Sequence, residues 1–569
     1  MKRTILLTTL VACCIASSCS RTQPRTILVS DFITEDMIQA EDAYPAVRAA
    51  LEECLKQDGS TLVLPGGTLP IKDRLCYEQF LRISNNDPSS KRIAFLIKGA
   101  KGLTVEGNGT LLLFSGFITP FYIENSSDVT IKNLNIDYTR THHSEGTIMA
   151  TGKDWVEVKF PQDYNVKIQS GILTFKDEDG VTYPYANLLE FDSVKKEVAH
   201  YVHDYWIWGG GIQAEKLPNG NFRILREGFE GTPGNILVFG ARARLCPCFT
   251  LDGVEGFNLK DVNIWHCGGM GVIAQRSRDI ELSRVQVVPS PGKDRMISIT
   301  ADATHFINCK GYIRMLDCTF TNQKDDATNI HGWYSVAGKK VSENSLELWS
   351  NYGMDFARPG MNLEIVDHNT MMTYDTLRVI EVYKYNDEYS LVSFDGPIPD
   401  NFSEKDILAD ADANPDVLIK GCYFGGNRAR GLLIGSRGKV VIEENTFHVP
   451  GTAILFEGDG NYWYEQSGVR DITIRKNLFK NCLYGSKTWG PAYIATGSGI
   501  PQREGSIYHK NILIEDNTFD TFDPRILNLY CTDGLIFRGN KIIPNTDYEF
   551  SRPSESFITK DCLNVEIEQ

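Results

Sequence analysis

The sequence lacks several features that mark common classes of protein. After the first twenty residues it has no apolar run long enough for a membrane helix, which needs about 20 apolar residues. It has no Gly-x-Ser-x-Gly nucleophile motif, no phosphate-binding loop and no dinucleotide fingerprint. The chain also has fewer basic than acidic residues, which gives it a formal net charge of −15. An acidic surface repels phosphate groups, so we expect no nucleic-acid partner.

Paired cysteines are missing as well. Three of the 14 cysteines lie in the first twenty residues, and the remaining cysteines are odd in number and scattered, which does not suit a disulfide framework. Cys246-Pro-Cys248 has no second pair and no nearby His-x-x-x-His, which argues against a metal site there. We therefore expect buried free thiols, and no metal or other cofactor.

The first twenty residues have the features of an export signal. A positively charged start at Lys2 precedes a short apolar stretch, residues 5–12, and small residues and cysteines follow. Cys13 and Cys19 each follow a small residue, as the modified cysteine of a lipoprotein does. We expect export to the periplasm or to an outer-membrane anchor, with membrane contact only through such a lipid. Cleavage without lipidation, and the choice between the two cysteines, stay open.

An imperfect repeat dominates the rest of the chain. Its unit is a short strand of alternating apolar and polar residues, then Asn, then another apolar residue. Adjacent copies lie about 23 residues apart where nothing is inserted, a period typical of one coil of a parallel β-helix. Alternation turns Ile, Val and Phe inward, and Asn at the corner tolerates left-handed backbone and can stack in a ladder. The copies begin at Val129, Asn258, Val440, Ile472, Ile512 and Leu535.

We therefore expect an all-β chain: a right-handed, pectin-lyase-like parallel β-helix with an N-terminal helix cap and two small β-barrel-like insertions. Helical periodicity at 42–55, followed by a strand–turn–strand pattern at 59–69, predicts the cap that covers the first coil. Two regions keep strand-like alternation but lack the Asn corner. The expected division is a signal at 1–20, cap and first coils at 25–139, an insertion at 140–250, coils at 251–332, a second insertion at 333–416 and final coils at 417–569.

The first insertion is rich in aromatic residues. Tyr201, Tyr205, Trp206 and Trp208 fall within eight residues and are followed by three glycines. Insertions in a solenoid often project from the binding face, and sugar rings stack on aromatic faces. These side chains could equally form the core of the insertion itself.

Two neighbouring coils carry an acid cluster. Asp302 lies on one coil and the Asp325–Asp326 pair on the next, and the 24 residues from Asp302 to Asp326 are about one coil. Equivalent positions in successive coils lie about 4.8 Å apart, so the three carboxylates should converge. Hydrolysis of a glycosidic bond needs one protonated and one ionised carboxyl group, and crowded like charges keep one of them protonated. Clustered carboxylates also bind calcium, but Lys324 and two nearby histidines argue against an all-oxygen cage.

Other polar residues on these coils are candidate substrate-binding groups, although each could also be ordinary surface charge. His305 and His331 flank the aspartates, and Arg276 lies one coil earlier. Glu364, in the second insertion, is a further carboxylate whose direction stays open. In-phase stacking of the coils after the second insertion would bring four more candidates near the acid cluster: Arg428, Glu457, Trp463 and Glu465.

At its aspartates the chain resembles the polygalacturonase-like β-helix hydrolases, but the Gly-His-Gly and Arg-Ile-Lys signatures expected for galacturonate are not evident. It more closely resembles glycoside hydrolase family 110, the α-1,3-galactosidases of gut-type bacteria. The resemblance runs over nearly all of the mature chain. The segments that carry it, besides the late Asn-Thr-Phe corners, are Asp42 to Thr68, Trp265 to Gly271, Gln323 to Gly332 and Asn427 to Gly431.

This resemblance implies removal of terminal α-1,3-linked galactose, with inversion and without a cofactor. The implied partner is an oligosaccharide or glycoconjugate, either a blood-group-B glycan or a linear galactose-α-1,3-galactose end. It also implies that Asp302, Asp325 and Asp326 are the catalytic set. We expect Asp326 to be the acid, with Asp302 and Asp325 handling the water.

Two other functions stay open. A β-helix polysaccharide lyase would need a calcium site, or an Arg or Lys base beside a uronate, and a polygalacturonase-like hydrolase would act on pectin. A non-catalytic glycan-binding β-helix would not need stacked carboxylates. The preference for fucosylated or linear substrates and the oligomeric state are not set by any motif.

Overall fold

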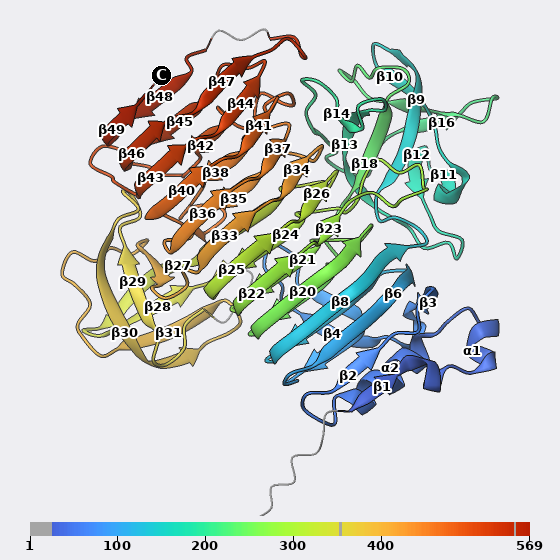
Figure 1. Cartoon of the computed structure of the whole chain (residues 1–569), viewed down its shortest axis with the longest axis horizontal. Coiled ribbons are helices and arrows are strands. Elements are labelled where there is room, and N and C mark those ends of the chain that lie inside the picture. The colour runs from blue at the N-terminus through green and yellow to red at the C-terminus, as the bar shows by residue number, and fades with distance from the viewer. Residues whose placement is uncertain (1–24, 352–355, 551–553, 569) are drawn as a thin grey trace, which may run out of the picture.

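The computed structural model describes residues 25–351, 356–550 and 554–568. Over these residues the chain winds into a parallel β-helix whose successive coils stack in three ladders (Figure 1). The predicted fold class is confirmed. The expected export signal, residues 1–20, lies outside the described residues. Within the described part of the chain, no helix is both long and apolar enough to cross a bilayer.

Each ladder runs nearly the full length of the solenoid. Ladder I contains β1 (Thr26–Leu28), β2 (Thr61–Val63), β6 (Thr104–Ser115), β8 (Ser127–Tyr138), β20 (Glu255–Ile264), β22 (Arg278–Ser283), β25 (Lys310–Leu316), β33 (Asp416–Lys420), β36 (Lys439–Glu443), β40 (Asp471–Arg475), β43 (His509–Glu515), β46 (Thr532–Arg538) and β49 (Leu563–Ile567). Ladder II contains β3 (Thr68–Lys72), the later parts of β6, β8 and β20, then β23 (Gln286–Val287), β26 (Thr319–Thr321), β34 (Tyr423–Gly425), β37 (Thr446–His448), β41 (Leu478–Lys480), β44 (Thr518–Thr521) and β47 (Lys541–Pro544).

Ladder III is the one that positions the acid cluster. Its strands are β5 (Ser89–Lys98), β7 (Ile118–Glu124), β19 (Phe249–Asp252), β21 (Val272–Gln275), β24 (Thr304–Ile307), β27 (Thr328–Ser342), β35 (Leu432–Ile434), β38 (Ile454–Phe456), β42 (Ile494–Thr496), β45 (Leu527–Tyr530) and β48 (Phe557–Lys560).

The alternation of the repeat builds the core of the solenoid. In ladder I each inward apolar residue lies directly beside its equivalent in the next coil, as Val440, Ile472 and Ile512 do. In ladder II the rings of Phe447, Phe479 and Phe519 stack, with successive centroids 4.9 and 4.7 Å apart. Burial of each such side chain is worth about 1.5–3 kcal/mol. All cysteines in the described ranges are free thiols, as expected, and all but Cys562 are buried.

The corner asparagines form a continuous hydrogen-bonded ladder between ladders I and II. The side-chain Nδ2 of Asn445 donates to Oδ1 of Asn477 at 3.0 Å, Asn477 donates to Asn517 at 3.0 Å, and Asn517 donates to Asn540 at 2.9 Å. The predicted stacking is thus confirmed for the late coils. Asn445, Asn477 and Asn517 are almost fully buried, so the ladder satisfies polar groups that would otherwise destabilise the core.

The left-handed residue at this corner is not the one that the repeat suggested. In the late coils it is the residue before the Asn, since Glu444, Lys476 and Asp516 have φ angles of 59°, 55° and 55°. In an early coil the same position is held by Asn133, at φ 56°. Reading left-handed tolerance from the Asn was therefore correct for the early coil and wrong for the late ones.

The first coil is covered by the expected cap. Helix α2 (Tyr44–Cys54) buries Val47 and Leu51 against the coil, and the short α1 (Glu35–Gln39) precedes it. Strand β4 (Tyr77–Leu81) pairs antiparallel with β5 and leads into the loop that carries Asn85 toward the acid cluster. The cap also contains the 3-10 turns η1 (Val29–Phe32) and η2 (Asp73–Leu75).

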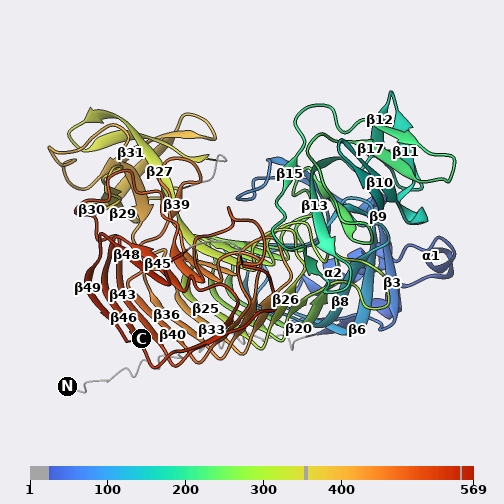
Figure 2. The same ribbon diagram turned by 90° about the horizontal axis from the view of Figure 1, so that it is seen from above.

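Both insertions rise from the same side of the solenoid (Figure 2). Insertion I has its own apolar core, formed by an antiparallel sheet and a separate two-stranded hairpin. The sheet contains β9 (Ser144–Gly152), β10 (Trp155–Lys159), β13 (Tyr185–Asp192), β14 (Glu197–Val198), β15 (Tyr205–Trp206), β16 (Ala214–Lys216), β17 (Phe222–Leu225) and β18 (Ile236–Ala241). The hairpin consists of β11 (Val166–Gln169) and β12 (Ile172–Phe175), and the short 3-10 turn η3 (Gln162–Tyr164) precedes it.

Insertion II is a closed antiparallel ring that grows out of ladder III. The later half of β27 pairs with β28 (Ser345–Trp349), and the ring continues through β31 (Tyr389–Phe394), β30 (Thr373–Lys384), β29 (Asn362–Val366) and β32 (Ile407–Asp410) back to β27. The short strand β39 (Glu465–Gln466) also pairs with β27. The same strand that carries the histidine beside the aspartates therefore continues into insertion II.

Candidate active site

The acid cluster lies where successive coils turn into ladder III. Strands β24, β27 and β35 start in register. Asp302, Asp326 and Arg430 each lie two positions before one of these strands, so they occupy equivalent places in three coils. The backbone N–H of Ala303 donates to the carbonyl oxygen of Asp326 at 3.0 Å, which ties the first two turns together. The spacing of 24 residues is thus one coil, as predicted.

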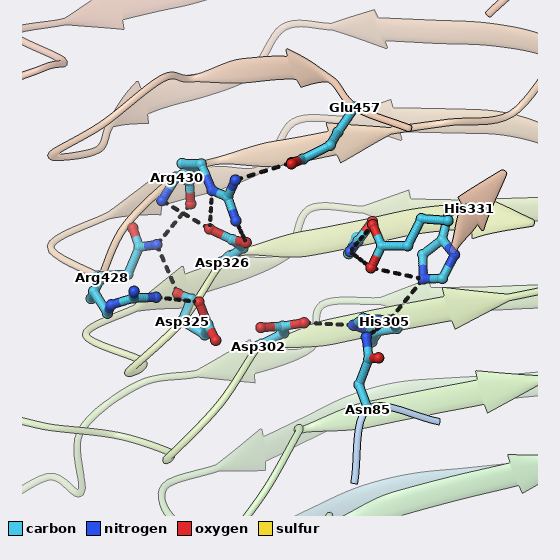
Figure 3. Close-up of polar contacts among 12 residues, drawn as sticks. Asn85, Asp302, His305, Asp325, Asp326, His331, Arg428, Arg430 and Glu457 are labelled. Carbon is cyan, nitrogen blue, oxygen red and sulfur yellow. Dashed lines mark hydrogen bonds and ion pairs between the residues drawn. The ribbon is translucent and has the colours of Figure 1, made fainter. Parts of the chain in front are cut away.

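The structure brings the three aspartates together (Figure 3). One carboxylate oxygen from each of Asp302, Asp325 and Asp326 lies within 4.8 Å of the other two. Asp302 and Asp326 are each 3% exposed, whereas Asp325 is only partly buried. Like charges this close cannot all be ionised without cations beside them, and the surroundings of each carboxylate decide which form it takes.

Two arginines hold Asp325 in its ionised form. Arg428 donates from Nη1 to Oδ1 at 2.7 Å, and Arg244 donates from Nη2 to the other oxygen. Arg428 is itself held in place by Asp204 of insertion I, 2.7 Å from its Nε. Burial acts to raise the pKa of Asp325, but Arg428 and Arg244 outweigh burial and keep the pKa below its usual value. This carboxylate is therefore an anion and not a proton donor.

Asp326 has the opposite tendency. Arg430 donates to it from its backbone N at 3.1 Å, from Nε at 3.0 Å and from Nη2 at 2.8 Å. Burial nevertheless raises the pKa of Asp326, and the charges of Asp325 and Asp302 add to this against the attraction of Arg430. Asp326 is thus the member of the cluster that holds a proton more readily than usual.

Asp302 is bound to a chain of histidines. Its Oδ2 lies 2.6 Å from Nδ1 of His305, whose Nε2 lies 3.0 Å from Nε2 of His331. Nδ1 of His331 donates to the carbonyl oxygen of Gly332 at 2.6 Å. Beyond His331 lies Glu465 of β39, with Oε1 3.6 Å from the imidazole Nε2. Figure 3 shows this chain running away from Asp302, on the side opposite Arg430.

Two groups of side chains have the composition of a metal site. The oxygen atoms of the three aspartates form one, but the three arginines around them already supply positive charge. His305, His331 and Glu465 form the other, with one nitrogen or oxygen each within 4.8 Å of the other two.

A pocket of about 860 Å³ opens beside the cluster. Arg428 and Arg430 form part of its wall, together with Glu457, which follows β38. Nη1 of Arg430 donates to Glu457 Oε2 at 3.0 Å, so a single guanidinium joins Glu457 to Asp326. Burial raises the pKa of Glu457 to about 7, opposed by Arg430 and supported by the charges of Glu465 and Asp326.

Aromatic side chains form another part of the pocket wall. Tyr201 and Trp206 come from insertion I, and Trp489 comes from the solenoid. Tyr205 instead packs on Phe229 in the core of insertion I. Tyr205 thus serves the core of the insertion, whereas sugar stacking on Tyr201 and Trp206 stays a prediction. Trp463 is about half exposed on a loop whose backbone N–H groups are bound by Asp459, and its part in substrate binding stays a prediction.

Arg276 lies elsewhere than its place in the repeat suggested, and the structure gives the direction of Glu364, which the sequence left open. Arg276 follows the far end of β21 and binds Asp252 through Nη2 at 2.6 and 2.8 Å, so its expected place beside the aspartates is wrong. Strand β21 starts beside the acid cluster, but Arg276 follows its last residue and is therefore four residues of strand away from the aspartates. Glu364 of insertion II binds Arg437 and the hydroxyl of Thr373, which ties the insertion to the coils rather than facing the aspartates.

Three further residues of the site were not among the predicted candidates. Arg430 occupies the same place in its coil as Asp326, but insertion II separates the two residues in the sequence and hides their equivalent positions. Arg244 and Asp204 belong to loops outside the repeat, so no period points to them. The one usable signal was the Asn-Arg-Ala-Arg-Gly segment, in which two arginines directly precede a ladder strand.

Comparisons with known proteins found family models for both insertions. Two family models match the insertions: the GLAA-B beta-barrel domain I over residues 144–237 and the GLAA-B beta-barrel domain II over residues 350–408. Among solved structures, an endo-xylogalacturonan hydrolase from Aspergillus tubingensis has a TM-score of 0.40 and 10% sequence identity, with 95% of this chain and 100% of that chain covered.

Similarity to curated proteins extends over almost the whole chain. Alpha-1,3-galactosidase B of Bacteroides thetaiotaomicron is 29% identical over 579 residues, which cover 99% of this chain and 93% of that protein. Alpha-1,3-galactosidase A of Shewanella woodyi is 32% identical over 517 residues, which cover 89% of this chain and 84% of that protein. The chain therefore belongs to the α-1,3-galactosidase family.

Proposed function

We propose that the protein is a glycoside hydrolase that removes terminal α-1,3-linked galactose from oligosaccharides or glycoconjugates, with inversion at the anomeric carbon. One observation carries the proposal: Asp302, Asp325 and Asp326 converge, and their surroundings favour different protonation states. The names of the relatives support galactose as the sugar and α-1,3 as the linkage. The residue pattern at 1–20 supports the further proposal that the enzyme is exported.

The role of each aspartate follows from its partners. Asp326, with its raised pKa, is the acid that protonates the glycosidic oxygen as the bond to the anomeric carbon breaks. Asp302, assisted by the anionic Asp325, takes a proton from the water that attacks this carbon from the opposite face. The nearest oxygens of the three carboxylates lie within 4.8 Å of one another, less than the roughly 6.5–9.5 Å typical between the carboxyl groups of inverting enzymes, so inversion is the part of the proposal that the configuration of the product must test. The new bond then gives galactose in the β configuration.

The pocket supports an exo-acting enzyme with room beyond the galactose. Arg428, Arg430 and Glu457 offer charged hydrogen-bonding groups, and Tyr201 and Trp206 offer apolar ring faces for further sugars. Such an arrangement fits a neutral glycan, since acidic and basic groups alternate along the wall.

The experiment compares α-1,3-, α-1,4- and α-1,6-linked galactobiose as substrates for the purified protein. We expect galactose release from the α-1,3 isomer alone, without the unsaturated product of a lyase. Asp302→Ala, Asp325→Asn and Asp326→Asn should each lower kcat/KM by about a hundredfold or more, as loss of acid–base assistance does. Asp317→Asn, on an exposed corner of the solenoid, is the matched control and should leave kcat/KM unchanged. Failure to release galactose from the α-1,3 isomer contradicts the proposal.

A further inference from the structure

The two histidines beside Asp302 require one more proton than their neutral forms carry. Nδ1 of His331 faces a carbonyl oxygen at 2.6 Å, which can only accept, so this nitrogen holds the ring's single proton. Nδ1 of His305 faces the Asp302 carboxylate at 2.6 Å in the same way. In neutral rings both Nε2 atoms would then present lone pairs to each other at 3.0 Å. A proton or a metal ion must therefore lie between them.

A proton on His305 satisfies every partner in the chain. His305 then donates from Nδ1 to Asp302 and from Nε2 to His331, while His331 donates from Nδ1 to Gly332. The carboxylate of Asp302 lies 2.6 Å from the ring of His305, whereas the carboxylate of Glu465 lies 3.6 Å from that of His331, so His305 is the better placed ring for the extra proton. Burial also lowers the pKa of His331. A carboxylic acid is a stronger acid than an imidazolium, so the proton does not move to Asp302. Asn85, 3.1 Å from Nε2 of His305, can turn its amide oxygen toward this proton.

The surrounding charges favour a cation here. Asp302 precedes His305 in its own coil, and Asp325 lies in the turn of the next coil, where His305 contributes to its ionisation. Glu465 approaches the far ring from β39 at 3.6 Å. The positive groups that face the same aspartates are Arg244, Arg428 and Arg430, which bind Asp325 and Asp326 rather than the histidines.

We propose that His305 is a positioning residue that carries a positive charge, bridging Asp302 and His331 so that Asp302 is held ionised as the base toward the attacking water. This deepens the proposed function and rests on it. One oxygen of Asp302 is occupied by His305, which leaves the other oxygen to take the proton of the water. The base is thereby Asp302, and Asp325 is the fixed anion beside it.

The first test needs no substrate, so it stands even if the proposed activity fails. The whole protein is labelled with ¹⁵N-histidine, and the state of each ring nitrogen is read by NMR at pH 7, with His305→Gln assigning the signals among the ten histidines. We expect both nitrogens of His305 to be protonated and His331 to be neutral. Two neutral rings overturn the inference. One equivalent of bound zinc, lost in His331→Ala, also overturns it, because a metal then replaces the proton.

The second test is the pH dependence of kcat/KM. His305→Gln keeps a hydrogen bond to Asp302 but removes the charge, so the carboxylate is protonated more easily. An opposite charge this close is worth about 1–3 pH units, so the acidic limb of the profile should move up by about that much. Activity should recover at higher pH, and it should recover more fully than in His305→Ala.

A purely structural role would lower activity at every pH without moving this limb. The matched control is His448→Gln, which breaks another histidine–carboxylate pair, His448 to Glu197 at 2.6 Å, away from the aspartates. It should leave the limb in place. An unmoved limb in His305→Gln overturns the inference, whereas absence of any galactosidase activity in the unchanged protein contradicts the proposed function instead.

Discussion

Replacing Glu457 by Gln should change how the stability of the protein depends on pH. Burial raises the pKa of this carboxyl group from 4.5 to about 7, even though it contacts Arg430. Between these two values the folded chain holds a proton that the unfolded chain has lost. The stabilisation is fully present below about pH 4.5 and is lost as pH rises through about 7. A glutamine side chain cannot ionise, so the Glu457→Gln variant should not show this loss.

The magnitude follows from the shift. At 1.36 kcal/mol per pH unit, a rise from 4.5 to about 7 corresponds to about 3 kcal/mol, of which about 2–3 kcal/mol falls between pH 5 and pH 8. Urea unfolding of the original protein and of Glu457→Gln at several pH values measures this change in the free energy of unfolding. The stability of Glu457→Gln relative to the original protein should rise by that amount from pH 5 to pH 8. The control Glu566→Gln, at an exposed position, should show no trend. A pH-independent difference at Glu457 would refute the reasoning.

Two further substitutions test the site and the solenoid separately. Arg430→Lys removes the bidentate contact with Asp326 at 3.0 and 2.8 Å, and a charged hydrogen bond is worth about 1.5–3 kcal/mol, so kcat/KM should fall by about tenfold to a hundredfold. Steady-state kinetics measures this, and an unchanged value would show that the arginine does not position the acid. Asn477→Ala interrupts the asparagine ladder and leaves buried partners unsatisfied, which should lower the free energy of unfolding by about 2–4 kcal/mol without changing kcat/KM. Its control is Asn511→Ala, on an exposed corner; equal losses in both variants would contradict the role given to the ladder.

The repeat made the fold and the centre of the site predictable, because both follow from one period. Strand alternation and a spacing of one coil predicted that Asp302 lies beside Asp326. Direct hydrogen bonding between the two successive coils holds these residues next to each other. Residues that lie outside the repeat, or beyond an insertion, could not be assigned to the site in this way. Arg244 reaches Asp325 from the loop after insertion I. Arg430 occupies the same place in its coil as Asp326, but the two coils are separated in the sequence by insertion II.

The sequence also did not predict which end of a ladder strand lies at the active site. Arg276 belongs to the correct coil but follows its strand, whereas the aspartates precede theirs. A residue's coil number can be read from a repeat, but which end of the strand meets the substrate depends on where the insertions rise. The same uncertainty applied to Glu364, whose partner Arg437 lies on a coil far along the chain.

Proton NMR of galactose-α-1,3-galactose during hydrolysis tests the central claim most directly, because it reports both bond cleavage and the configuration of the sugar first released. An acid at Asp326 and a water-activating base at Asp302 predict β-galactose as the first product, followed by slow mutarotation. Appearance of α-galactose first would show that the aspartates act through a covalent intermediate and would contradict this mechanism.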